Sequence, residues 1–198
     1  MWQIKFENQI FEVLLPDWEA FLFSDEIYWP IQIRGKNVPA VYRSVRLSAG
    51  RLLLAEKLLS GDIHEDELLK KSVQKNLDRF FQLRNRWKAN WEKKTLSELP
   101  VRIRQWQRHV QEIHQDSNYS IHQLANDVKV RLIIDLLLRQ SENENQDEFG
   151  HLLEITDFKY KSLTYEYSFI WNNDLSTIFD KDQNWYLYRN ITNPGGLK

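Results

Sequence analysis

Apolar residues recur at helical spacing from Leu47 as far as Gln140, and this pattern constrains the fold more than any other feature of the sequence. The expected helices run from Leu47 to Gly61, from Asp62 or His64 to about Lys94, from Thr95 or Ser97 to Asp116, and from Ser120 to about Gln140. The first of them is apolar around most of its circumference, which is typical of a helix covered on all sides. Four helices with short connections predict an antiparallel bundle over residues 46–140.

Both ends of the chain instead show the alternation of apolar and polar side chains that is typical of half-buried strands. The expected strands are Trp2–Phe6, Ile10–Leu15, Tyr28–Arg34 and Val38–Tyr42 near the N-terminus, and Tyr165–Trp171 and Trp185–Arg189 near the C-terminus. Ten of the 31 residues from Phe158 to Tyr188 are aromatic, so we expect this segment to pack against the rest of the protein. The two ends are predicted to share one small antiparallel sheet.

The sequence therefore predicts an α+β protein with a single domain over residues 1–198. Within that domain the expected parts are N-terminal β-hairpins over 1–43, the helical bundle over 46–140, an acidic linker over 141–157, and an aromatic β segment over 158–198 that packs back on the bundle. The pattern predicts no particular oligomeric state.

Composition excludes several classes of function. The chain contains no cysteine, which excludes disulfides, thiolate metal sites and cysteine nucleophiles. Its N-terminus does not resemble a signal peptide, and no stretch reaches the roughly 18 consecutive apolar residues of a membrane span, so a cytoplasmic location is expected. The five histidines form no HExxH motif, and the paired glycines occur only at Gly195-Gly196. We therefore predict no metal site, no cofactor and no catalytic residue.

Charge is distributed unevenly, although the formal net charge is only -1. Residues 70–108 contain 12 basic and 3 acidic residues, a local charge of +9, whereas residues 1–30 and 141–157 are acidic. The basic residues expected on the solvent-facing side of the long helix form a basic ridge: Lys71, Lys75, Arg79, Arg86 and Lys93. Such a ridge suits phosphate contacts, with Trp91 and Trp106 as stacking surfaces if they are exposed. The alternative is a solvated face neutralised by the acidic termini.

Two further groups of charged residues lie within the helices. Arg84 occupies the apolar stripe between Phe80 and Trp87, where it requires a carboxylate from Glu98 or another helix, or else a bound anion. The series Asp127, Arg131, Asp135 and Arg139 recurs every four residues, which is typical of structural ion pairs along a helix.

Three functions are compatible with these patterns. The leading prediction is a non-catalytic interaction or adaptor protein that docks on a protein partner through the basic ridge and an aromatic surface. The second is nucleic-acid binding through the same ridge, which salt-dependent affinity would distinguish. The third is an enzyme or a small-anion-binding protein centred on Arg84, which a pocket without a carboxylate partner would indicate.

Overall fold

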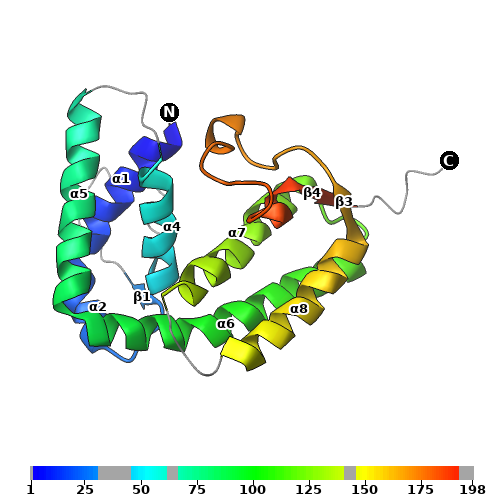
Figure 1. Cartoon of the computed structure of the whole chain (residues 1–198), viewed down its shortest axis with the longest axis horizontal. Helices are drawn as coiled ribbons and strands as arrows, with labels where there is room; N and C mark the ends of the chain where they lie inside the picture. The colour runs from blue at the N-terminus through cyan, green and yellow to red at the C-terminus, as the bar shows by residue number, and fades with distance from the viewer. Residues whose placement is uncertain (1, 31–45, 62–66, 141–145, 192–198) are drawn as a thin grey trace. The chain divides into compact units, whose positions relative to one another are not determined.

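The computed structural model describes residues 2–30, 46–61, 67–140 and 146–191 (Figure 1). Helices dominate, and two short antiparallel strand pairs accompany them, which agrees with the α+β class. The chain divides into two compact units, Met1–Glu98 (unit 1) and Leu99–Lys198 (unit 2), and helix α6 (Lys88–Gln115) contributes residues to both. No helix in the described parts of the chain combines the length and the hydropathy needed to cross a membrane.

Unit 1 is built from helices that surround an aromatic core. Its elements are α1 (Trp2–Leu14), η1 (Leu15–Asp17), α2 (Trp18–Phe23), β1 (Trp29–Pro30), β2 (Arg46–Leu47), α4 (Ala49–Leu59), α5 (Glu67–Arg86) and the first part of α6. The Trp18 ring stacks on Trp91 with centroids 5.1 Å apart, and the edge of Phe80 meets Trp18 at 5.3 Å. All three rings are buried, so α2, α5 and α6 are held by one aromatic cluster.

The first predicted N-terminal hairpin is wrong, and the second is described only in part. Residues 2–14 form helix α1, whose buried face carries Ile10, Phe11 and Leu14 but also the polar residues Glu7 and Asn8. The short alternation of apolar and polar residues at the start of the chain therefore occurs in a helix and not in a strand. Of the second predicted pair, Trp29–Pro30 forms a strand paired with Arg46–Leu47, and Val38–Tyr42 lies outside the described residues.

The predicted helix boundary at Thr95 or Ser97 is also wrong. The chain turns sharply at Trp87, between α5 and α6, and α6 then continues through both residues and through Pro100 (Figure 1). The hydroxyl of Thr95 donates to the Glu92 carbonyl at 2.9 Å, and that of Ser97 to the Lys93 carbonyl at 2.8 Å. Both side chains thus bond back within the helix instead of capping its start.

Unit 2 consists of the rest of α6, α7 (Ile121–Leu138), α8 (Gln146–Leu163) and an irregular segment. That segment contains β3 (Thr164–Glu166), η2 (Asn173–Leu175), η3 (Trp185–Tyr188) and β4 (Arg189–Ile191). Helix α7 starts as predicted, because Ser120 and Gln123 form a capping box. The Tyr160 ring of α8 packs against Trp106 at 4.9 Å, and its hydroxyl donates to the Tyr186 carbonyl at 3.1 Å.

Three predictions for these regions require correction. The acidic segment 141–157 is not a linker, since residues from Gln146 onward form α8. Acidic residues near a helix start are favoured by the helix dipole, so their clustering was compatible with a helix.

Strand β4 begins only at Arg189, after a 3-10 turn, and it pairs with β3. Among the described residues the two ends of the chain therefore form separate strand pairs, not one shared sheet.

The four-helix bundle predicted for residues 46–140 is not confirmed. Its expected helices are divided between the two units, and in unit 1 α4 packs chiefly on α1. The apolar stripes are confirmed in large part: Leu52, Leu53, Leu58, Val73, Leu77, Phe80, Leu99, Ile103, Leu124, Val128 and Leu132 are buried, whereas Leu69, Trp87, Ile113 and Ile121 are only partly buried. Whether both units fold as one domain stays a prediction.

Candidate functional site

The basic ridge is exposed at every position that the sequence selects. Lys71, Lys75, Arg79 and Arg86 lie on α5 and are exposed. At about 100° per residue, these four positions fall within an arc of about 80° around the helix. Lys93 is exposed as well, but it lies on α6 beyond the turn at Trp87, so it is not on the same helix face.

The N-terminal half of the ridge forms an open polar surface along α5. Its lining residues are Lys71, Gln74, Lys75, Asp78, Arg79 and Gln82. The Gln74 amide donates to the Asp78 carboxylate at 2.8 Å, and none of the three cations has an ion pair within the described residues. This surface therefore presents three cations and two amides against one carboxylate.

The other end of the ridge is partly neutralised. Arg86 lies 3.9 Å from the Glu19 carboxylate, and Lys93 lies 3.7 Å from that of Asp25. All four side chains are more than half exposed, so water and salt screen these pairs strongly. The pairing agrees in part with the alternative that acidic residues near the N-terminus neutralise the ridge.

An aromatic pair adjoins this end of the ridge. The Phe23 ring, which is 58% exposed, meets the edge of Trp87 with centroids 4.8 Å apart, and the Arg86 guanidinium lies 5.2 Å from the Trp87 ring. Sequence reasoning missed this surface and considered Trp91 and Trp106 instead, both of which are buried. Phe23 and Trp87 are 64 positions apart, and the packing of α2 against α5 and α6 brings them together.

Arg84 has the carboxylate partner that the apolar stripe required. Its guanidinium lies 3.3 Å from the Glu56 carboxylate of α4 and within 5.3 Å of the Phe80 and Phe81 ring centroids. Burial raises the pKa of Glu56, and the charge of Arg84 opposes that rise. The partner is an acid on another helix, and the structure accounts for Arg84 without a bound anion.

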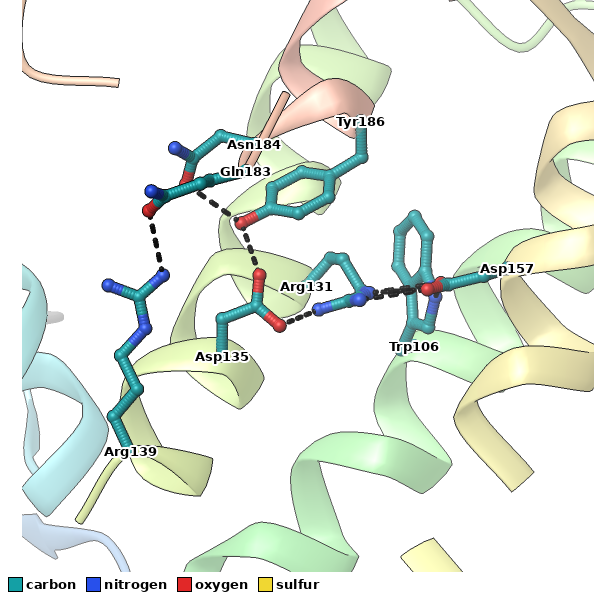
Figure 2. A network of polar contacts seen from close by, with 8 residues as sticks. All are labelled: Trp106, Arg131, Asp135, Arg139, Asp157, Gln183, Asn184 and Tyr186. Atoms are coloured by element: carbon teal, nitrogen blue, oxygen red, sulfur yellow. Dashed lines mark hydrogen bonds and ion pairs between the residues drawn. The ribbon is translucent and has the colours of Figure 1, made fainter. Parts of the chain in front are cut away.

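A buried polar network joins four elements of unit 2 (Figure 2). Arg131 of α7 donates from Nε to Asp157 Oδ1 at 2.9 Å and from Nη2 to Oδ2 at 2.8 Å. It also forms an ion pair with Asp135. Asp157 accepts the indole N–H of Trp106 at 3.0 Å, and Asp135 accepts the Tyr186 hydroxyl at 2.8 Å. The network therefore ties α6, α7, α8 and η3 together.

The network is a structural centre. Burial lowers the pKa of Arg131, but the two carboxylates more than offset this and raise it above its ordinary value. Burial, and then the Asp135 carboxylate, raises the pKa of Tyr186, so its hydroxyl stays a donor. Every charged group of the Arg131–Asp135–Asp157 cluster has a partner of opposite charge.

The sequence series along α7 is thus only partly an i,i+4 ladder. The Arg131–Asp135 pair is present, whereas Asp127 contacts His109 of α6 and Tyr119. Arg139 contacts Gln183 at 3.5 Å. Partners from other elements replace the predicted neighbours because the inner side of α7 is buried against them.

Asp127 belongs to a second cluster, which joins α6 to α7 near their connection. His109 Nδ1 lies 3.2 Å from Asp127 Oδ2 and 3.3 Å from Glu112 Oε2, and Tyr119 donates to the same Asp127 oxygen. The ligating atoms of His109, Glu112 and Asp127 all lie within 4.8 Å of one another. Burial lowers the pKa of His109, but hydrogen bonds and charge from the two carboxylates give a net rise. The sequence signal was the His109-x-x-Glu112 spacing, which puts both side chains on one helix face.

Helix α8 presents apolar side chains on the side away from its buried face. Leu152, Ile155 and Phe158 are exposed, Phe158 by 77%, while Leu153 and Tyr160 are buried. Exposed apolar groups that gather on one helix are a common feature of surfaces that bind other molecules.

Known proteins give no further guidance to the function. The chain was compared with protein-family models, with curated proteins and with solved structures. None of the three comparisons gives a significant match.

Proposed function

We propose that this chain is a non-catalytic interaction protein that binds an acidic surface of a protein partner through the basic ridge of α5 and the adjoining Phe23–Trp87 pair. The observation that carries the proposal is the row of Lys71, Lys75 and Arg79, which are exposed together and have no ion pair within the described residues. The cytoplasm remains the proposed location.

A protein partner is favoured because cations occur beside a pair of aromatic rings, of which Phe23 is exposed and Trp87 is partly buried. Aromatic residues and arginine are enriched where protein surfaces bind one another, and aromatic side chains offer a large area of apolar contact. Arg86 over Trp87 brings both kinds of contact to one place. Nucleic acid is the second candidate, favoured by the three cations at i, i+4 and i+8, which follow one another at intervals of about 6 Å along the helix.

Charge reversal tests the proposal. Wild-type protein and the K71E/K75E/R79E variant would be used for affinity capture from host cells, with R104E/R108E/K159E as a matched control. The control reverses three exposed cations of unit 2 and changes the net charge equally. We expect a partner that the control retains and the ridge variant loses, and whose purified form binds the wild type directly.

Fluorescence anisotropy with labelled DNA and RNA separates the two candidates. Binding of nucleic acid that weakens steeply with salt, and that the ridge variant loses, would replace the protein partner with a nucleic acid. Identical capture by the wild type and the ridge variant would refute a role for the ridge in either case.

A further inference from the structure

We propose that His109, Glu112 and Asp127 form a binding site for a divalent transition-metal ion, and that Zn²⁺ is the ion their ligand set fits best. The inference is independent of the basic ridge, because all three residues belong to unit 2 and the ridge belongs to unit 1. The site would connect α6 to α7.

The distances between the candidate ligand atoms fit a tetrahedral ion. Zinc bonds of about 2.0–2.1 Å to nitrogen and oxygen place neighbouring ligands of a tetrahedron about 3.3–3.4 Å apart. His109 Nδ1 lies 3.2 Å from the Asp127 oxygen and 3.3 Å from the Glu112 oxygen. The third separation, between the Glu112 and Asp127 oxygens, is at most 4.8 Å, and the exposed Glu112 side chain can adjust to bring it to the tetrahedral value.

Hydrogen bonding explains only part of the close approach of the Glu112 and Asp127 oxygens to His109 Nδ1. Nδ1 carries at most one proton, so it donates one good hydrogen bond, yet two carboxylate oxygens approach it almost equally. The two carboxylates approach the same imidazole nitrogen, and a divalent ion in place of the imidazole proton would offset their mutual repulsion. The Asp127 oxygen that faces His109 also accepts the Tyr119 hydroxyl, so the carboxylate is oriented toward the imidazole from two sides.

Tyr119 acts as a positioning residue for the ligand Asp127. It is 7% exposed, and its hydroxyl donates to Oδ2 at 2.5 Å. Such partners fix the orientation of a ligand and commonly affect metal affinity.

The three proposed ligands differ in solvent exposure, and the exposed side of the cluster leaves room for a fourth ligand. His109 and Asp127 are 18% and 20% exposed, whereas Glu112 is 58% exposed. One side of the cluster therefore faces solvent, from which the ion can enter and a water molecule can complete its coordination. One imidazole and two carboxylates also neutralise the charge of a divalent ion.

Metal titration of the full, untagged chain tests the site. The protein would be stripped with a chelator, dialysed at pH 7.5, and titrated with ZnCl₂ by calorimetry and with CoCl₂ by visible absorption. We expect saturable binding of one ion per chain and the intense Co²⁺ bands of four-coordinate geometry. The double variant H114A/H122A removes two exposed histidines outside the cluster, and it should bind as the wild type does.

Variants of the cluster decide whether it is the site. H109A should lose binding altogether, and Y119F should weaken it by roughly 10–100-fold. E112Q tests the exposed carboxylate without disturbing the fold, and it should weaken binding at least as much as Y119F. Absence of saturable binding by the wild type, or equal affinity of the wild type and E112Q, would overturn the proposal. Loss of metal binding in H114A/H122A alone would also overturn the proposal.

Discussion

Arg131 donates two hydrogen bonds to the Asp157 carboxylate, from Nε to Oδ1 at 2.9 Å and from Nη2 to Oδ2 at 2.8 Å. The Arg131 side chain is 8% exposed and that of Asp157 is 13% exposed, so the pair lies largely out of water. Because a buried ion pair balances a large desolvation cost against its mutual attraction, it stabilises only as a complete unit.

The variant D157N should therefore be clearly less stable than the wild type. It leaves Arg131 with the Asp135 carboxylate alone, and it weakens the acceptor for the Trp106 indole. We expect the free energy of unfolding to fall by about 3 kcal/mol, toward the lower end of the range for breaking a buried pair. Urea denaturation followed by far-UV circular dichroism measures this change. D182N removes an exposed carboxylate and serves as the control; equal losses in both variants would contradict the structural role of the network.

R84L should also destabilise the protein, and by an amount that depends on pH. Without Arg84, the partly buried Glu56 loses the opposing charge, so its pKa rises further above the value in the unfolded chain. A carboxyl whose pKa is higher in the folded state costs nothing at low pH, where it is neutral in both states. It costs most once the pH exceeds both pKa values.

The expected deficit of R84L is about 1–3 kcal/mol at pH 7 and smaller at pH 4. Denaturant unfolding of R84L, E56Q and the double variant at both pH values measures it, and the double variant should recover part of the loss. R79L, at an exposed position of the same helix, should change stability by less than about 0.5 kcal/mol. A deficit that is independent of pH would show that Glu56 is not its source.

Apolar periodicity predicts the helices best where burial is apolar throughout. Helices α4 and α7 were anticipated within a few residues, because their inner faces are mostly apolar, with Arg131 as the exception in α7, and because Ser120 supplies a clear start. Helix α1 was missed for the opposite reason. Its buried Glu7 pairs with Arg51, and its buried Asn8 contacts Ser72, so polar residues interrupt the stripe that would have identified it.

The candidate sites show the same division between local and tertiary information. Exposure of the basic ridge follows from angular position on one helix, and the sequence contains that information. The Arg131–Asp157 pair spans 26 positions and two helices, so the sequence showed only the local partner Asp135. Likewise, Asp127 approaches His109 only when α6 and α7 pack together, whereas the His109-x-x-Glu112 half of the cluster was visible in the sequence.

S120A should destabilise α7 from its first turn. Ser120 accepts a hydrogen bond from the Gln123 backbone N–H at 3.3 Å, and the Gln123 side chain accepts the Ser120 N–H at 2.8 Å. Removing the hydroxyl leaves a helix donor without its cap, so the free energy of unfolding should fall by about 0.5–2 kcal/mol. Chemical denaturation measures the change, and S117A in the same connection is the control. No difference between the two would mean that the capping box contributes nothing in solution.

Calorimetry of two core variants tests whether the two units fold as one domain. W91A removes a ring from the aromatic core of unit 1, and D157N breaks the polar network of unit 2. If the chain is a single cooperative domain, as the sequence predicts, each variant should shift one common transition downward by about 2–4 °C per kcal/mol lost. The calorimetric and van't Hoff enthalpies should then agree in all three proteins. Two transitions, of which W91A moves one and D157N the other, would instead show that units 1 and 2 unfold independently, despite the continuous helix α6 that links them.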